Sequence, residues 1–358
     1  MEGANHLGVP LCSTKRAEIL ATESRIQIHK KNIVHARHGG INPMSASKVY
    51  LSIAMPRLLY GCQVWPISDN NVNLMERAHQ DAARRLQGLP QQRADPAATA
   101  LMGWLSVRAT IDMYRLFFLW TLIRIPNILQ QIVSDFLIES FHKSFSKCNG
   151  PGPLCMLART CHKYNIQDTV IKLLILNLNR ISRYTWKKIV KNIVWSHYKN
   201  NWYMECIMYK SLSIFLKCVN SVAMSWLWHL CKDRPKSIRK CKSTARMLIS
   251  NTNLYVKYTR ISRLCPLCSM YCRLCHEHVL FECPALDNER VKCWTRVTLS
   301  MPPAMQSEVE HMNNSRKLIF VFSGLNCNYM KEWIHIYDEM VNFMYNLNRS
   351  FQLLAGQA

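Results

Sequence analysis

The stretch between Cys265 and Cys283 constrains the fold more than any other part of this 358-residue chain. It holds five of the sixteen cysteines, and Cys265, Cys268, His278 and Cys283 form the pattern C-x2-C-x9-H-x4-C. Two thiolates on a tight turn, followed by a His and a Cys about one helical turn apart, suit tetrahedral Zn²⁺. A segment this short buries too little apolar surface to fold unaided, so metal binding would supply the missing free energy. The pattern therefore predicts a zinc knuckle.

Three other side chains in the stretch, Cys272, Cys275 and His276, compete for a place in the ligand set. The four cysteines between positions 265 and 275 have the spacing C-x2-C-x3-C-x2-C, which is similar to that of iron–sulfur proteins. A reduced cysteine-rich loop without metal is a further alternative. Mixed Cys and His ligation is typical of zinc, so the pattern favours zinc over both alternatives. The third ligand position is the one that the spacing determines least.

The composition of the whole chain indicates a helical globular protein. Hydrophobic residues make up 49% of the sequence and aromatic residues 10%, which argues against wholesale disorder. The chain has only 11 glycines and 14 prolines, and its apolar residues recur mostly at spacings of three and four. This periodicity favours helices over a many-turned β architecture. We expect a mainly α fold.

Positive charge is concentrated in the middle of the sequence. Residues 151–270 hold 21 Lys and Arg against 3 Asp and Glu, which is +18 of the formal net charge of +24. Such an excess indicates a polyanionic partner. Acidic lipid and an ordinary solvated surface are the alternatives, but no amphipathic basic anchor or lipidation motif accompanies the charge. We therefore expect RNA or DNA as the partner, and no membrane.

Two groups of basic residues are candidates for contacts with phosphates. The first group accompanies a predicted helix with Trp186, Val190 and Val194 on its apolar stripe. Its members are Arg180, Arg183, Lys187 and Lys191. The second group is so dense that it favours a loop that follows a nucleic-acid backbone. Its members are Arg234, Lys236, Arg239, Lys240, Lys242 and Arg246. Among the aromatic residues, Trp186 and Trp195 are candidates for packing or for stacking on bases.

The sequence offers binding groups and no catalytic centre. Two-metal nucleotidyl transfer requires paired carboxylates, and the chain has no Asp-Asp pair. Glycine-rich phosphate loops of the common types are also missing from the sequence. We expect a protein that is not an enzyme and that has no small-molecule substrate.

We expect a location in the nucleus and/or the cytoplasm, and no secretion. Met1 to Pro10 does not have the basic head and long apolar run of a secretory signal. The most apolar stretch, Tyr114 to Ile138, is interrupted by Arg124, Pro126 and Asp135, which predicts buried helices and not a membrane span. Sixteen cysteines in such a chain are better explained by reduced thiols and metal than by disulfides.

Short motifs along the chain carry a resemblance to a known family. They are His6-Leu7-Gly8-Val9, Leu59-Tyr60-Gly61 with Trp65, Leu86-Gln87-Gly88-Leu89-Pro90, Cys265-Pro266-Leu267-Cys268, and His278-Val279-Leu280-Phe281-Glu282-Cys283-Pro284. In this order the chain resembles the C-terminal end of non-LTR retrotransposon (LINE-type) reverse transcriptase polyproteins. The resemblance spans nearly the whole chain, although the part from 150 to 260 matches only in its helical and basic character.

The resemblance implies the region that follows the polymerase palm, where template RNA and target DNA are held. In that family the catalytic carboxylates and the endonuclease lie in other segments, so this chain would act beside an upstream reverse transcriptase segment. The implied order is a helical thumb-like region over 1–146, a Gly/Pro linker over 147–153, a basic helical linker region over 154–263, the zinc knuckle over 264–300 and a C-terminal helical segment over 301–358.

A second interpretation makes the chain a structural or protein-interaction module. A helix predicted from about Met330 presents Trp333, Ile336 and Tyr337 on one side, and would dock onto a polymerase partner. The basic charge would then be incidental to function.

Overall fold

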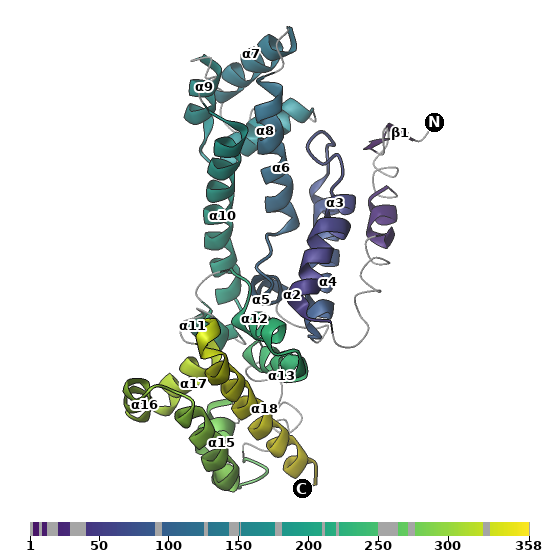
Figure 1. Ribbon diagram of the computed structural model, residues 1–358. Coiled ribbons are helices and arrows are strands. Elements are labelled where there is room, and N and C mark those ends of the chain that lie inside the picture. Colours follow the sequence, from purple (N-terminus) through teal and green to yellow (C-terminus); the bar gives the residue numbers. More distant parts are fainter. Residues whose placement is uncertain are drawn as a thin grey trace. The chain divides into compact units, whose positions relative to one another are not determined.

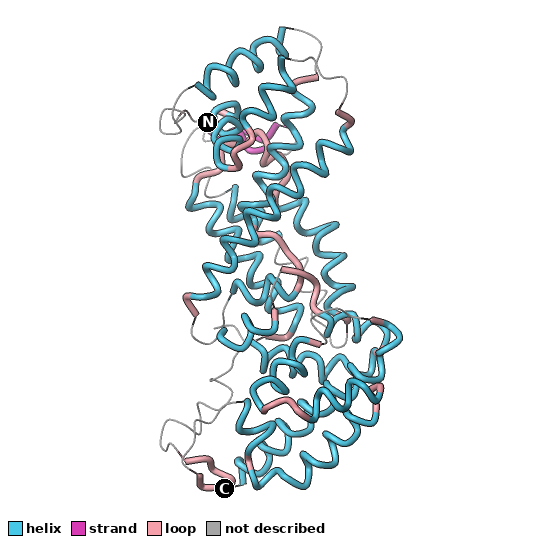
Figure 2. Tube along the Cα trace, turned by 90° about the vertical axis from the view of Figure 1, so that its left-hand side faces the viewer, coloured by secondary structure: helices cyan, strands magenta, loops and turns pink. Residues whose placement is uncertain are grey.

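Helices make up almost all regular structure in the described parts of the chain (Figure 2), which confirms the mainly α fold. The computed structural model describes residues 3–6, 9–12, 21–28, 41–89, 95–124, 128–142, 150, 152–175, 181–209, 212–219, 222–249, 264–270, 276–324 and 330–357. Within these ranges, the one sheet is a hairpin in which β1 (Gly3–His6) pairs antiparallel with β2 (Val9–Cys12). Among the described helices, none combines the length with the apolar content that crossing a bilayer requires.

The chain divides into two compact units, each assembled from segments that are separated in sequence. Unit 1 comprises Met1–His35, Tyr50–His79 and Leu105–Trp202, and unit 2 comprises Ala36–Val49, Gln80–Trp104 and Tyr203–Ala358. The Gly/Pro linker expected at 147–153 falls within unit 1, although residues 143–149 and 151 lie outside the described residues. The five-part division expected from the sequence stays a prediction.

The helices of unit 1 enclose an apolar core. Trp186 is 1% exposed, and its Nε1–H donates a hydrogen bond to the Leu116 carbonyl at 2.7 Å. Val190 and Val194 follow at helical spacing and are fully buried, which confirms the predicted apolar stripe. The elements are η1 (Tyr50–Ala54), α3 (Met55–Leu58), α6 (Val107–Leu122), α7 (Ile128–His142), α8 (Pro153–Lys163) and α9 (Gln167–Ile175), with residues from α4 (Asp69–Gln87) and α10 (Arg183–Ile207).

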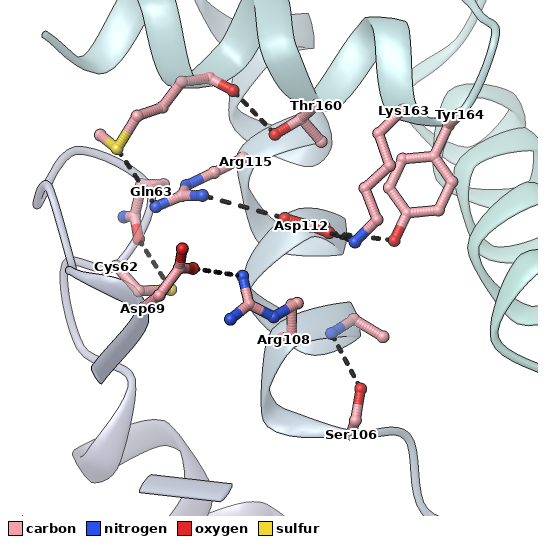
Figure 3. Close-up of polar contacts among 12 residues, drawn as sticks. Cys62, Gln63, Asp69, Ser106, Arg108, Asp112, Arg115, Thr160, Lys163 and Tyr164 are labelled. Atoms are coloured by element: carbon pink, nitrogen blue, oxygen red, sulfur yellow. Dashed lines mark hydrogen bonds and ion pairs between the residues drawn. The ribbon is translucent and has the colours of Figure 1, made fainter. Parts of the chain in front are cut away.

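A buried carboxylate ties α6 to the end of α8 (Figure 3). Asp112 Oδ2 accepts hydrogen bonds from Lys163 Nζ at 2.6 Å and from Tyr164 OH at 3.0 Å. Burial, reinforced by the charge of Asp112, raises the pKa of Tyr164, so the hydroxyl stays protonated and donates. Arg115 lies on the other side of the carboxylate, with Nη1 3.8 Å from Oδ1. These partners offset part of the cost of burying the carboxylate between the helices.

Unit 2 is organised around α18 (Ile334–Gln357), whose Tyr337, Phe343 and Phe351 are fully buried. Trp226 packs on this helix with its ring centroid 5.2 Å from that of Tyr337, and its Nε1–H donates to the Phe322 carbonyl at 3.1 Å. Figure 1 shows α13 and α15 beside α18. The other elements are α2 (Pro43–Val49), α5 (Asp95–Leu101), α11 (Ser213–Cys218), α12 (Trp226–Asp233), η4 (Pro235–Ser237), α13 (Ile238–Ile249), η5 (His278–Glu282), η6 (Pro284–Leu286), α15 (Asp287–Leu299), α16 (Pro303–Glu310), α17 (Asn314–Ser323) and η7 (Lys331–Trp333).

Candidate metal centre

The four ligands predicted for the knuckle come together in unit 2. The ligand atoms of Cys265, Cys268, His278 and Cys283 all lie within 4.8 Å of one another. The sulfurs of Cys265 and Cys283 are 3.9 Å apart, and His278 Nε2 lies 3.6 Å from the Cys268 sulfur. Cys265, His278 and Cys283 are buried, while Cys268 is partly exposed. Such a cluster can hold a metal ion.

The first two cysteines sit on a tight turn closed by backbone hydrogen bonds. The Cys265 amide donates to the Met270 carbonyl at 3.0 Å, and the Ser269 amide donates to the Cys265 carbonyl at 2.9 Å. Ser269 has a φ of +54°, a left-handed conformation that reverses the chain directly after Cys268. The C-x2-C spacing therefore brings both sulfurs to the same side of the turn.

His278 and Cys283 are brought together by a π-helical turn, η5, and not by the α-helical turn that the spacing suggested. The Cys283 amide donates to the His278 carbonyl at 2.7 Å, which is the hydrogen bond from residue i+5 to residue i that defines a π turn. Cys283 is five residues after His278, and an α-helix completes a turn in 3.6 residues. In an α-helix the two side chains would therefore point in different directions. The wider turn corrects this offset.

Arg290, from α15, holds the end of this turn in place. Its Nε donates to the Leu280 carbonyl at 3.1 Å, and its guanidinium also bonds the Cys283 carbonyl and the Asp287 carboxylate. The Leu280 carbonyl lies two residues after His278, and the other carbonyl belongs to Cys283 itself. The guanidinium therefore fixes the backbone between these two ligands. Nothing local to the position of Arg290 in the sequence marks it for this role.

A bound cation would change the protonation of the Cys283 thiol. Burial raises the pKa of Cys283 to about 12, and the neighbouring Cys265 thiol acts in the same direction. A cation among the sulfurs would reverse this effect, because it stabilises thiolates. Burial lowers the pKa of His278, so the imidazole is neutral and one ring nitrogen keeps a lone pair that can bind a metal ion. Its other nitrogen, Nδ1, lies 3.8 Å from the Glu282 carboxylate.

The knuckle is built into the core of unit 2. Val279 and Leu280, between the last two ligands, are fully buried. The Phe281 ring lies edge-on to Trp294 of α15, with ring centroids 5.6 Å apart, and 5.5 Å from Phe343 of α18. Phe281, between the last two ligands, therefore packs both on α15, within the predicted knuckle, and on α18, outside it.

Of the three alternative ligands, only His276 lies within the described residues, and it points to a backbone carbonyl. His276 is fully buried, and its Nε2 lies 2.9 Å from the Met247 carbonyl, with its ring against Phe322. Burial lowers its pKa to about 4, so the ring is neutral and Nε2–H donates to that carbonyl. Cys272 and Cys275 lie outside the described residues.

The first basic group lies on α10. Arg183 and Lys191 are exposed, and Lys187 is partly covered, with Nζ 5.7 Å from the Phe117 ring centroid. Arg180 lies outside the described residues. Trp186 belongs to the core and cannot stack on a base, because only 1% of it is exposed.

The second basic group is helical, and the expectation of a loop at this position was wrong. α13 buries Cys241, Ala245 and Leu248, which follow one another at spacings of four and three residues. This apolar face holds the helix against unit 2, although the rest of the segment is densely charged. Lys236 and Arg239 are exposed. Three others have hydrogen-bond partners within unit 2: Lys240 Nζ with Asn342 Oδ1 at 2.5 Å, Arg246 Nε with the Gly88 carbonyl at 2.7 Å, and Arg234 with His335 Nδ1 at 3.3 Å. The side chain of Lys242 lies near Gly88, where an added Cβ would be 3.4 Å from its Cδ.

Comparison with known proteins adds no relative to this description. No protein-family model, no curated protein and no solved structure matches the chain.

Proposed function

We propose that this protein is a zinc-stabilised, nucleic-acid-binding segment of the kind found at the C-terminal end of LINE-type reverse transcriptases. It would position template RNA or target DNA beside a separate polymerase segment, without an active site of its own, in the nucleus and/or the cytoplasm. The observation that carries the proposal is the row of exposed cations on α10, in a region of the sequence with 21 basic and 3 acidic residues.

Zinc is the metal that the ligand set suits best. Around a tetrahedral Zn²⁺, with bonds of about 2.3 Å to sulfur and 2.0–2.1 Å to nitrogen, two sulfurs lie about 3.8 Å apart, and a sulfur and a nitrogen about 3.6 Å. Two of the six distances among the ligand atoms agree with these values: 3.9 Å between the sulfurs of Cys265 and Cys283, and 3.6 Å from the Cys268 sulfur to His278 Nε2. All six are within 4.8 Å. Three thiolates and one imidazole are a common structural zinc set, whereas iron–sulfur clusters are held mostly by four thiolates.

The competing proposal, a protein-interaction module that docks through its C-terminal helix, has less support. The apolar face of α18, including Tyr337, Met340 and Phe343, is buried against other helices of unit 2. That face is therefore occupied within the unit, and a protein partner would have to use a different surface.

A salt titration of the zinc-loaded chain tests the proposal. We expect binding to a structured RNA whose log Kd rises linearly with log salt concentration, because each phosphate contact releases condensed counterions. Neutralising Lys191 and Arg239 together should weaken binding and reduce the slope by about one to two units. Lys331→Ala, which removes an exposed lysine outside both basic groups, is the matched control and should leave the slope unchanged.

Absence of binding at low salt would overturn the proposal. Binding of an upstream polymerase segment that is insensitive both to salt and to these substitutions would favour the interaction module instead.

A further inference from the structure

Tyr184, at the start of α10, is unusually exposed for an aromatic residue. It is 78% exposed, although the helix that carries it is anchored in the core of unit 1. Its ring offers solvent a large flat face that can stack on another ring. The helical pattern of the sequence marks the apolar stripe at Trp186 but does not mark Tyr184 as accessible, because exposure depends on packing.

The ring shares its helix face with lysines. Tyr184, Lys187, Lys188 and Lys191 occupy positions i, i+3, i+4 and i+7, so their side chains line one side of α10 over two turns, about 10 Å. Lys188 and Lys191 are exposed. From Arg183 to Met204 the helix has no acidic residue, so this face has no carboxylate of its own helix to neutralise it.

An adjoining face of α10 anchors the helix in the core of unit 1. Trp186, Val190 and Val194 are buried in the unit 1 core, and the hydrogen bond from Trp186 Nε1 to the Leu116 carbonyl fixes the rotation of the helix. At the N-terminus, the Ser182 hydroxyl accepts a hydrogen bond from the Thr185 amide at 3.1 Å. The backbone positions from which Tyr184 and the lysines extend are therefore set before any partner binds.

We propose that this face of α10 is a stacking platform for single-stranded nucleic acid, with the Tyr184 ring against a base and the lysines against the flanking phosphates. The inference rests on the proposed function and makes it more specific. A ring can stack on a base only where the base is unpaired and its face is free, while lysines alone would not distinguish a single strand from a duplex. The combination selects the single strand.

Binding of a labelled oligouridylate of about 16 nucleotides to the full zinc-loaded chain tests the inference. Loss of one stacking contact in Tyr184→Ala should raise Kd about five- to 150-fold without changing the salt slope, and Tyr184→Phe should bind like the unaltered chain because the ring remains. Lys191→Ala should instead lower the slope by about 0.7, the value for one phosphate of a single strand. Binding to a hairpin duplex should not respond to Tyr184→Ala.

The matched control is Tyr203→Ala, because Tyr203 is also an exposed tyrosine of α10, at 47%, but lies outside this face. The Tyr184 variants should keep the helical circular dichroism of the parent chain, since the side chain is exposed. Suppose that the parent chain binds the oligonucleotide. The stacking inference is wrong if Tyr184→Ala weakens this binding no more than Tyr203→Ala does, or if Tyr184→Phe binds as weakly as Tyr184→Ala. The proposed function stands in either case. If the parent chain binds neither RNA at low salt, the proposed function falls and the inference falls with it.

Discussion

At the scale of single residues, the two nitrogens of His278 face different groups. Nε2 points into the sulfur cluster, 3.6 Å from Cys268, and Nδ1 lies 3.8 Å from the Glu282 carboxylate. A carboxylate behind a ligating imidazole orients the ring and raises its basicity. The four ligands and this carboxylate together resemble a site adapted to a cation, whereas His276, two residues earlier, is held by a backbone carbonyl.

The first prediction at this scale concerns Cys283. We expect the parent chain to retain one equivalent of zinc on dialysis and Cys283→Ser to lose it, because the substitution removes one of three thiolates. Elemental analysis measures both. Cys293→Ser is the control, because Cys293 is also buried but lies outside the cluster, and it should retain the metal. Retention of zinc by Cys283→Ser, or iron in place of zinc in the parent chain, would contradict the assignment.

At the scale of the elements, the end of α17 depends on a glycine. Gly324 caps this helix with a φ of +57°, and a Cβ at this position would lie 2.5 Å from Trp226 Nε1. The indole cannot move freely, because its N–H is bonded to the Phe322 carbonyl and its ring packs on Tyr337. Phe322 in turn contacts His276, so this cap supports the backbone that leads into the knuckle.

We therefore expect Gly324→Ala to destabilise unit 2 by about 2–5 kcal/mol, from the left-handed backbone together with overpacking against Trp226. Gly88→Ala is the matched control: its φ is +66°, but a Cβ there meets only the side chains of Arg246 and Lys242, at 3.4 Å. It should cost about 1–2 kcal/mol. Urea denaturation of both variants would compare them, and equal losses would mean that the contact with Trp226 does not matter.

At the scale of the whole molecule, the metal cluster belongs to one of two units. The η5 turn that carries His278 packs on α15 and α18 in unit 2, whereas the core of unit 1 is built from α6, α8 and the first part of α10. All four ligands lie in unit 2, so metal binding should stabilise unit 2 against unfolding. It should not stabilise unit 1 directly, because unit 1 contains none of the ligands.

Removal of the metal with a chelator should show this difference. We expect faster amide hydrogen exchange in α15, in α17 and around Leu280, with little change in α6 and in residues 186–194 of α10. Mass spectrometry of peptides would measure it, and the Cys283→Ser variant should reproduce the pattern without a chelator. Uniform loss of protection in both units would mean that they do not unfold separately.

Much of this protein was predictable from local sequence. The helices follow from apolar residues at spacings of three and four, as at Trp186, Val190 and Val194, since the side chains of one helix face recur at that interval. The four clustered ligands were also predictable, because C-x2-C and H-x4-C each bring their two residues together within a single turn of chain.

Only the tertiary structure decided which polar and aromatic residues are accessible, since exposure depends on packing between segments far apart in sequence. It buried Trp186 and left Tyr184 in solvent, although both flank the same lysines. It bonded His276 to the Met247 carbonyl and turned His278 toward the sulfurs. It made the dense basic group a helix, because an apolar face at Cys241, Ala245 and Leu248 had neighbouring helices to bury it.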